Sequence, residues 1–297
     1  MSDNAPVRDA PAAMTGDVTA GETERDFLAH YDPRAFPCFA VTVDVVLVTI
    51  HQGRLAVLLI ERTTHPSRGA WTLPGGFVGV AEDLPDAAWR TLARETGVRT
   101  LPPGTHLEQI ATYGGPGRDP RTRVVSAAYL ALTPDIALPR SAAHGGRARF
   151  WPVADLAGDD APPLAFDHAT IVHDGVERAR AKLEYTTVAL SFVEEPFTLA
   201  DLRHVYETVW GAALDPSNFR RKALDTPDFV VPLGDAARRE QRGGRGRPGE
   251  LYRKGMAYRL DRVIARPHVP SHVPSHIPDE PADAEPHMGH SRRGDGR

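Results

Sequence analysis

The sequence predicts an α/β (α+β) protein with two folded modules and a tail at each end, and three observations lead to that prediction. Strand-like runs rich in Val and Leu alternate with one or two helical patterns up to about residue 183, which is typical of a layered domain. From Pro196 the pattern changes to two short helices followed by strand-like runs around a basic segment. Both ends are aperiodic or rich in Pro, so we expect no packed core there.

A length of 297 residues leaves room for about two domains. The expected segments are a disordered tail over 1–35, a first domain over 36–183, a second domain over 184–266, and a disordered Pro/His-rich tail over 267–297. In the last segment His268, His272 and His276 recur at four-residue spacing, but the prolines between them forbid the helix that would bring them to one metal ion. We therefore expect no metal site in that tail.

The composition also bounds the compartment. Cys38 is the only cysteine, which excludes an internal disulfide and fits a reducing environment, and we expect a buried, inert thiol rather than a nucleophile. The longest apolar run, Phe39–Ile50, is too short to span a bilayer and contains Asp44. The first residues lack the basic and then apolar pattern of a secretory signal. We expect a cytoplasmic protein with no membrane partner.

The first domain begins with a predicted hairpin. Phe39–Ile50 reads as a buried strand, His51–Gly53 as a turn, and Leu55–Glu61 as the returning strand. Trp71–Leu73 leads into the glycine loop described below. Further elements follow in chain order, and they are strands over Leu107–Tyr113, Val124–Leu132 and Phe150–Val153 and a helix over Asp167–Leu183. The period of Glu184–Val193 is ambiguous between strand and helix, and we expect this segment to pack between the two domains.

The stretch Leu73–Val98, LPGGFVGVAEDLPDAAWRTLARETGV, predicts a glycine loop that leads into a helix. Asp83 is the expected N-cap, Pro85 lies in the first turn, and Gly97 ends the helix. A generic amphipathic helix after a glycine turn would explain Leu92 and Ala88 but not the spacing of the glycine, glutamate and arginine residues around them. That spacing resembles the Nudix box of hydrolases that split nucleoside diphosphate derivatives, and its matching residues here are Gly76, Glu82, Arg90, Glu95, Gly97 and Val98.

In the Nudix family three helix carboxylates hold Mg²⁺ or act as base, and the resemblance implies that their places are taken here by Thr91, Arg94 and Glu95. These positions share one helix face, since they are spaced i, i+3, i+4. Mg²⁺ requires several oxygen ligands, and a guanidinium beside it repels it. We therefore expect a degenerate box with no catalytic residue, no metal and no required cofactor.

The alternative is an active Mg²⁺-dependent hydrolase of ADP-ribose in which Glu95 holds the metal and Glu82 supports it through Arg90. Against it, Thr91 is no base at neutral pH, and Thr122–Pro134 offers no replacement carboxylate.

The loop Tyr113–Arg123, YGGPGRDPRTR, is a candidate ligand loop. Its arginines match phosphate oxygens in a bidentate way, and Tyr113 could stack on a base. The plainer interpretation is a solvated basic loop. The run GRDPR and the following RVVSAAY are similar to the substrate loop of Nudix proteins that handle ADP-ribose, which favours a ligand role. The expected ligand-binding residues are Arg62, Gly75, Gly76, Tyr113, Arg118 and Arg121.

The second domain reads as a helix-turn-helix with a wing. Thr198 caps a helix that Gly211 ends, and Asp215 caps a second, basic helix over Ser217–Leu224. Two strands are expected around a basic, glycine-rich tip, and they are Phe229–Pro232 and Met256–Val263. Between Phe197 and Arg266 the chain carries 14 Lys and Arg against 9 Asp and Glu, whereas the rest carries 21 against 30. A basic module on an acidic chain indicates a polyanion partner.

Taken together, the degenerate box, the GRDPR loop, LAFDHATIV, AKLEYTTVAL, FTLADLRHVYE, NFRRKAL and GRPGELYR resemble the Nudix-related transcriptional regulators of NAD metabolism, the NrtR type, over about Phe36 to Arg266. The resemblance implies a Nudix α/β/α sandwich with a mixed sheet that senses ADP-ribose. It also implies a winged helix-turn-helix that binds double-stranded operator DNA as a homodimer and releases it when the ligand binds. The expected DNA-binding residues are Ser217, Asn218, Arg220, Arg221, Lys222, Arg245, Arg247 and Tyr252.

Among these, Asn218 and Arg221 are the expected base readers, since Asn pairs with adenine and Arg with guanine. A repressor is the first interpretation, with activation, and a sugar rather than an NAD pathway, left open. A third class, a nucleotide-binding scaffold whose basic part binds RNA or protein, is disfavoured by the GRPGELYR wing.

Overall fold

The computed structural model describes residues 23–96, 102, 105–138, 146–234 and 250–267. Within them the first domain is built on a mixed sheet of order β3-β2-β1-β6-β5, with β4 paired to β1 and β7 paired to β2. Its strands are β1 (Ala40–His51), β2 (Arg54–Glu61), β3 (Trp71–Thr72), β4 (Gly75–Phe77), β5 (His106–Tyr113), β6 (Val124–Leu132) and β7 (Ala148–Pro152). The pair β1–β6 is parallel and the others are antiparallel.

The predicted hairpin is confirmed as β1 and β2, with His51 paired to Arg54. Gln52 and Gly53, the two residues between them, have φ of 49° and 74°. A two-residue turn with both φ values positive matches the right-handed twist of the strands it joins. The apolar character of β1 is continuous rather than alternating, because the sheet is covered on both faces.

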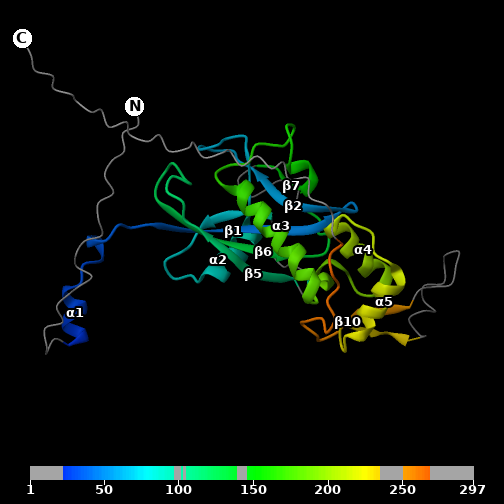
Figure 1. Cartoon of the computed structure of the whole chain (residues 1–297). Coiled ribbons are helices and arrows are strands. Elements are labelled where there is room, and N and C mark those ends of the chain that lie inside the picture. Colours follow the sequence, from blue (N-terminus) through cyan, green and yellow to red (C-terminus); the bar gives the residue numbers. More distant parts are fainter. Residues whose placement is uncertain (1–22, 97–101, 103–104, 139–145, 235–249, 268–297) are drawn as a thin grey trace, which may run out of the picture. The chain divides into compact units, whose positions relative to one another are not determined.

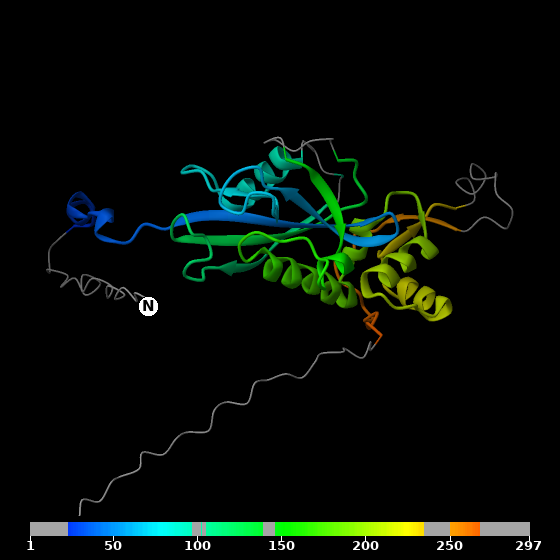
Figure 2. The ribbon, with the colours of Figure 1, turned by 90° about the horizontal axis from the view of Figure 1, so that it is seen from above.

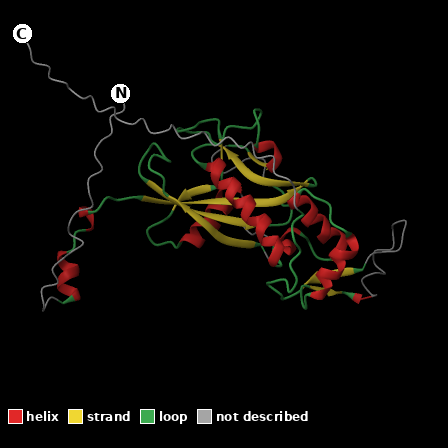
Figure 3. Cartoon of the chain, in the orientation of Figure 1, coloured by secondary structure: helices red, strands yellow, loops and turns green. Residues whose placement is uncertain are grey.

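The two covering helices lie on opposite faces of the sheet, as Figures 1 and 2 show. Helix α2 (Leu84–Thr96) packs Ala87, Ala88 and Leu92 against one set of strand residues, and α3 (His168–Tyr185) packs its apolar side against the alternate set. The helices and strands are distinguished by colour in Figure 3. The expected α/β/α sandwich with a mixed sheet is confirmed.

Helix α3 lies unusually close to β1 at Gly175. A Cβ on Gly175 would meet the side chain of Val46 at 2.9–3.0 Å, which real side chains avoid. The absent side chain therefore sets the distance between α3 and the sheet, and α3 is held as a straight, tightly packed element along the first domain.

The second domain contains α4 (Leu199–Trp210), α5 (Pro216–Asp225) and a small sheet of order β8-β10-β9, from β8 (Phe197–Thr198), β9 (Val230–Pro232) and β10 (Leu251–Lys254). The predicted caps are confirmed. The Thr198 hydroxyl accepts from the Asp201 N–H, and the Asp201 carboxylate accepts from the Thr198 N–H. The Asp215 carboxylate accepts from the Asn218 N–H. Helix α4 ends at Gly211, whose φ of 68° favours glycine.

The second wing strand was predicted over Met256–Val263, and that prediction is wrong. The strand is β10, Leu251–Lys254, which pairs with both β8 and β9. Residues 256–263 instead lie beside the C-terminal end of α3. There the Leu260 N–H donates to the Tyr185 carbonyl, and the Thr187 hydroxyl donates to the Ala257 carbonyl. Leu251 and Tyr252 are both buried because β10 is central in its sheet, so the period-2 alternation of a half-exposed strand is missing from the sequence.

The segment of ambiguous period, Glu184–Val193, contains a buried 3₁₀ helix, η4 (Val188–Phe192). It contributes to one apolar cluster that includes Val46 and Leu59 of the first domain as well as Tyr206 and Trp210 of the second. The two domains therefore share a core rather than being joined by a bare linker.

The structure differs from the sequence prediction in part of the first 35 residues. Helix α1 (Glu24–His30) and a 3₁₀ turn, η2 (Pro33–Ala35), form there although none of their residues is buried. A capping box between Thr23 and Asp26 supplies the local stabilisation that core packing does not. Cys38, in the segment between η2 and β1, is exposed, so the expectation of a buried thiol is wrong. The helix end expected at Gly97, most of the wing tip and the tail from residue 268 lie outside the described residues. None of the helices in the described ranges is long and apolar enough to cross a bilayer.

Candidate functional site

A cavity of 660 Å³ opens where the glycine loop, the β2–β3 connection, the β5–β6 loop and the start of α3 meet. Five of the six predicted ligand residues line it, namely Arg62, Gly75, Gly76, Arg118 and Arg121. The cavity is also lined by polar and aromatic residues from β1, β4, α2 and the segment that begins α3, which are Asp44, Phe77, Arg94, Glu95, Phe166 and His168.

The two glycines form the floor of this cavity because nothing larger fits. Gly75 pairs with Asp44 across β4 and β1, and a Cβ on Gly75 would overlap the Asp44 Oδ1. A Cβ on Gly76 would lie 3.1 Å from the Thr91 Oγ1 and 3.2 Å from the Arg94 Nη2. The Pro-Gly-Gly loop is thus pressed between β1 and α2, which fixes the height of the cavity floor.

Arg118 carries the central positive charge of the cavity. Its side chain is only 6% exposed, and it binds the Asp167 carboxylate twice, from Nε at 2.8 Å and from Nη2 at 2.6 Å. Its Nη2 also lies 3.5 Å from the Asp44 Oδ2, which accepts a further bond from the Ser126 hydroxyl at 2.5 Å. Arg118 is therefore oriented by two carboxylates at the closed end of the cavity.

Two further arginines flank one aromatic ring. The guanidinium carbons of Arg62 and Arg121 lie 4.8 Å and 5.8 Å from the centroid of the Phe166 ring. Burial and the charge of Arg121 lower the pKa of Arg62, while the Arg121 fork is bound by Asp119. Arg62 donates from Nε to the Pro66 carbonyl at 2.8 Å, so its guanidinium is the one of this pair best placed to meet an anion in the cavity. Phe166 has a φ of 57°, an uncommon backbone state for a bulky residue, and it turns the chain into α3.

His168 closes the inner end of the cavity and is 3% exposed. Its Nδ1 accepts from the Leu73 N–H at 2.9 Å, so the ring proton is on Nε2, which faces the Asp44 Oδ1 at 3.6 Å. Burial lowers the pKa of His168, opposed by the nearby carboxylates of Asp44 and Asp167. The imidazole is thus neutral at pH 7, and it ties the start of α3 to the glycine loop.

Two residues of the Nudix-like box, Glu82 and Arg90, stabilise the loop that precedes α2. Arg90 binds the Glu82 carboxylate from Nε and Nη2 at 2.5 Å and 2.7 Å, and Nη2 also donates to the Phe77 carbonyl. The hydrogen bonds from Arg90 and from the Gly79 N–H lower the pKa of Glu82 to about 2. These contacts hold the loop between Phe77 and Leu84 without using the cavity.

The face that would hold Mg²⁺ does not fit a metal. Thr91 is fully buried, and its hydroxyl finds no hydrogen-bond partner within the described residues. Arg94 donates from Nε and Nη2 to one oxygen of Glu95, at 2.9 Å and 2.7 Å. A cation there would meet a guanidinium where the ion needs carboxylate oxygens.

Tyr113, the sixth predicted ligand residue, does not line the cavity. Its hydroxyl donates to the Asp174 Oδ2 of α3 at 2.7 Å, and its ring packs against the α3 side of the sheet. Burial and this bond raise the pKa of Tyr113.

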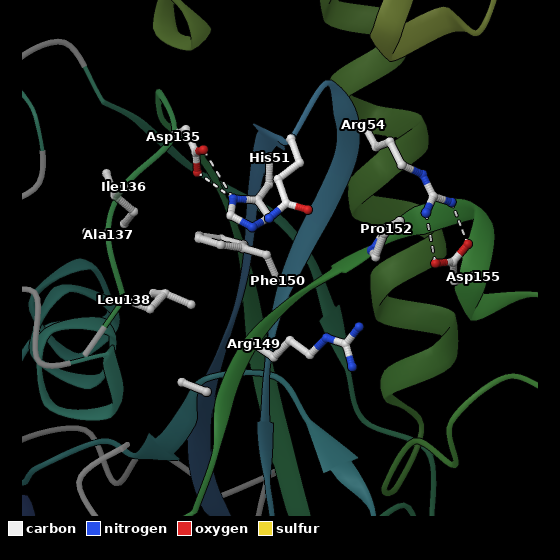
Figure 4. Close-up of a pocket in the computed structure, with 12 residues that line it drawn as sticks. His51, Arg54, Asp135, Ile136, Ala137, Leu138, Arg149, Phe150, Pro152 and Asp155 are labelled. Atoms are coloured by element: carbon white, nitrogen blue, oxygen red, sulfur yellow. Dashed lines mark hydrogen bonds and ion pairs between the residues drawn. The ribbon is translucent and has the colours of Figure 1, made fainter. Parts of the chain in front are cut away.

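A second cavity, of 620 Å³, lies at the other end of the strands between β1, β2, β7 and the segment after β6 (Figure 4). Among the side chains that Figure 4 labels there, His51 is hydrogen-bonded to Asp135 and Arg54 is paired with Asp155, and these four are between a third and a half exposed. Arg149 lies over the Trp151 ring, with its guanidinium carbon 4.2 Å from the centroid. With one arginine outside the two pairs, against the three predicted arginines of the first cavity, this cavity is the weaker candidate for a charged ligand.

The predicted DNA residues on α5 are exposed except Lys222, which is half-buried, and they differ in their hydrogen-bond partners. Arg221 donates to the Asn218 Oδ1 at 2.8 Å, and Arg220 lies 3.5 Å from Glu250. Lys222 instead donates to the Val263 carbonyl at 2.8 Å. Tyr252 is 2% exposed, with its hydroxyl bonded to Glu250. Ser217 lies exposed in the first turn of α5, while Arg245 and Arg247 lie outside the described residues.

Sequence reasoning missed three residues of the cavity. Asp44 lies in a run that was read as an apolar strand, and an isolated carboxylate in such a run is the signal that could have found it. Phe166 and His168 lie in LAFDHATIV, which contributes to the family resemblance and to the predicted helix from Asp167 but predicts no ligand contact. The juxtaposition of an aromatic residue and a histidine immediately before a helix gave no local sign of a shared cavity.

Comparisons with known proteins agree with this division of the chain. Residues 39–174 match the NUDIX domain model, and residues 189–254 match that of the NrtR DNA-binding winged helix domain. The chain is 33% identical over 233 residues to the ADPR responsive transcriptional repressor NtrR of Acinetobacter baylyi, covering 78% of this chain and 88% of that protein.

Two further relatives match different extents of the chain. The crystal structure of Shewanella oneidensis NrtR complexed with a 27mer DNA is similar at a TM-score of 0.63 and 35% identity, covering 76% of this chain and 99% of that one. An ADP-ribose pyrophosphatase of Methanocaldococcus jannaschii is 33% identical over 135 residues, which is 46% of this chain and 72% of that protein.

Proposed function

Because this chain belongs to the family of NrtR-type regulators, which join a Nudix domain to an NrtR winged helix DNA-binding domain, we propose that it is a repressor of NAD-metabolism genes controlled by ADP-ribose. In this proposal ADP-ribose binds in the cavity of the Nudix domain and weakens the hold of the winged helix domain on operator DNA. The name of the Acinetobacter relative, an ADPR responsive repressor, supports both parts.

The observation that carries the proposal is the combination of Arg62, Arg118 and Arg121 in one cavity with a box helix whose remaining carboxylate is bonded by Arg94. Guanidinium forks match the oxygens of a diphosphate, so the cavity supports binding of such a ligand. The same helix offers Mg²⁺ no cluster of carboxylates, so we propose that the ligand is bound and not cleaved, and that no metal is required.

Hydrolysis of ADP-ribose is the second candidate, favoured by the similarity of residues in the Nudix domain to an ADP-ribose pyrophosphatase. It requires Mg²⁺ at Glu95. Release of AMP from ADP-ribose in the presence of Mg²⁺, at a turnover of about 1 per second or faster, would support this candidate.

For DNA recognition we propose that α5 enters the major groove, with Asn218 and Arg221 reading base edges and Ser217, Arg220 and Lys222 contacting the backbone. Arg245 and Arg247 of the wing tip would contact phosphates or the minor groove. A homodimer would present two copies of α5 to two half-sites. A cytoplasmic location is part of the same proposal.

The test is a gel-shift titration with DNA from upstream of NAD-biosynthesis genes. We expect a shift at low salt that weakens steeply as salt rises, because phosphate contacts dominate affinity. Added ADP-ribose should release the DNA, whereas adenosine, which lacks the diphosphate, should not. A shift that is indifferent to ADP-ribose, or no shift at low salt, would contradict the proposal.

A further inference from the structure

Helix α3 connects the two candidate sites of this chain. It runs for 18 residues, about 27 Å at 1.5 Å per residue, from the cavity to the second domain (Figure 1). Asp167 and His168 at its start contact the cavity, whereas its last turns contact α4 and residues 257–264. Hydrogen bonds attach one end of α3 to the cavity and the other end to the second domain. A displacement of the helix at one end would therefore change the contacts at the other.

At the cavity end the carboxylate of Asp167 is engaged by Arg118. Asp167 occupies the N-cap position of α3, but its side chain caps no amide, because Arg118 binds one of its oxygens from Nε and the other from Nη2. An anion that binds Arg118 competes directly with Asp167. The released carboxylate would then be free to accept from the first amides of α3, which are the donors that an N-cap normally satisfies.

At the other end Arg180 and Trp210 make a reciprocal pair of bonds between α3 and α4. The Arg180 Nε donates to the Val209 carbonyl at 3.0 Å, and the Trp210 indole Nε1 donates to the Arg180 carbonyl at 3.0 Å. Trp210 is 3% exposed and packs edge-on against Tyr206, which in turn contacts Phe219 of α5. Through these rings the position of α3 is linked to the helix proposed to read DNA.

Between its ends α3 has little freedom to bend. Gly175 lies directly against Val46 of β1, and Ile171, Val176, Ala179 and Leu183 are buried in the shared core. A closely packed interior transmits displacement rather than absorbing it. A change at Asp167 is therefore expected to move α3 as a unit along the sheet.

We propose that α3 is the coupling element of this regulator: a diphosphate ligand competes with Asp167 for Arg118, shifts α3, and repositions α4 and α5 through the Arg180–Val209 and Trp210–Arg180 bonds. The inference rests on the proposed function, since it names the route by which the ligand would control DNA binding. Arg180 and Trp210 are positioning residues, which contact neither ligand nor DNA in this scheme. Control requires that the ligand bind the two arrangements of α3 with different affinity.

The test compares Arg180→Met with Arg178→Met. Both variants remove a guanidinium from α3 and keep an unbranched side chain, but the guanidinium of Arg178 binds Glu108 of β5, whereas that of Arg180 binds Val209 of α4. Operator affinity is measured with and without ADP-ribose, and ADP-ribose affinity with and without operator. Linkage requires the two ratios to agree in each protein.

For Arg180→Met we expect ADP-ribose affinity without DNA within about twofold of wild type, and a coupling ratio at least about fivefold smaller. Arg178→Met should keep the wild-type ratio. Trp210→Phe, which removes only the indole donor and keeps a ring, should also reduce the ratio and covers the case in which Arg180→Met does not fold. Equal ratios in all folded variants would overturn the role of α3.

A second readout does not depend on DNA. The indole N–H resonance of Trp210 should shift when ADP-ribose is added to wild type and to Arg178→Met. An unmoved resonance at saturating ADP-ribose would overturn the route through α3. Wild-type protein that binds neither ADP-ribose nor operator would instead contradict the proposed function, so the two failures are distinguishable.

Discussion

The guanidinium of Arg94 lies on the carboxylate of its neighbour Glu95, with Nη2 2.7 Å and Nε 2.9 Å from the same oxygen, Oε1. In the box pattern that this helix resembles, both positions carry carboxylates that hold Mg²⁺. Here a fixed positive charge occupies part of the space that the ion would need, and the buried hydroxyl of Thr91 adds no charge. The pairing therefore reduces the negative charge that Glu95 would offer a cation.

Replacing Arg94 should restore metal affinity in steps. Arg94→Gln removes the repulsion, and Arg94→Glu adds a carboxylate next to Glu95. We expect Arg94→Glu to bind Mn²⁺ at least about tenfold more tightly than Arg94→Gln, a difference of about 1.4 kcal/mol, and wild type to bind most weakly. Titration followed by the electron paramagnetic resonance of free Mn²⁺ measures this. Wild-type affinity equal to that of Arg94→Glu would favour the hydrolase alternative.

The cavity floor gives a prediction with a matched control. Gly75→Ala places a methyl group on the Asp44 carboxylate, and we expect a loss of about 1–3 kcal/mol in the free energy of unfolding together with weaker ADP-ribose binding. Gly115→Ala lies in the neighbouring loop, where a Cβ would meet nothing within 4 Å, and it should change neither quantity measurably. Urea denaturation and calorimetric titration test both. Equal effects of the two variants would show that the contact with Asp44 is not the cause.

We expect substitutions of Phe166 and Tyr113 to have opposite outcomes for ADP-ribose affinity, although only Tyr113 was predicted from the sequence to bind the ligand. Phe166→Leu removes the ring that both Arg62 and Arg121 contact, and we expect ADP-ribose affinity to fall at least about tenfold. Tyr113→Phe removes only a hydroxyl bonded to Asp174 outside the cavity, so affinity should stay within about twofold. Calorimetric titration distinguishes the two. A large loss for Tyr113→Phe would mean that the ligand extends to the α3 side of the sheet.

The contrast between these two residues illustrates what the sequence could and could not predict. The caps at Thr198 and Asp215 and the β1–β2 hairpin follow local rules, and the structure has them where they were expected. The glycines and arginines of the cavity were found because each has a short-range signature. The direction in which Tyr113 points could not be predicted in the same way, because it depends on a contact with Asp174 of α3, 61 positions away. The wing strand was misplaced for a related reason, because β10 is buried by its pairing with β8, which no local period reveals.

The effect of substitutions in the second domain on operator binding should depend on the hydrogen bonds that each side chain makes in the free protein. Arg221 is exposed and bonded only to Asn218 among the contacts of the free protein described above, so Arg221→Ala should cost about 1–3 kcal/mol in operator binding and relax base preference at one position. Lys222 is bonded to the Val263 carbonyl, and Lys222→Ala should weaken binding less and without a change in base preference. Tyr252→Phe should leave operator affinity unchanged, because its hydroxyl is bonded to Glu250. Competition gel shifts with single-base operator variants give all three results.

The last prediction concerns the acid stability of the fold and depends on His168. Burial lowers the pKa of His168 in the folded protein. Below about pH 6.5 His168 therefore becomes protonated in the unfolded chain, whereas in the folded protein it becomes protonated only at lower pH. The contribution of His168 to stability is therefore complete above the unfolded pKa and is lost as pH falls toward the folded pKa, by up to about 1.4 kcal/mol per pH unit.

His168→Gln isolates this contribution because glutamine does not titrate and its side-chain oxygen can accept from the Leu73 N–H as Nδ1 does. We expect the variant to be less stable than wild type at pH 7, owing to poorer packing in a site that is 3% exposed, but to lose less stability between pH 6.5 and pH 5. Because the carboxylates are the same in both proteins, the difference between the two slopes reports on residue 168. Urea denaturation at half-unit pH steps measures it, and parallel curves would mean that the imidazole is protonated in the folded protein as readily as in the unfolded chain.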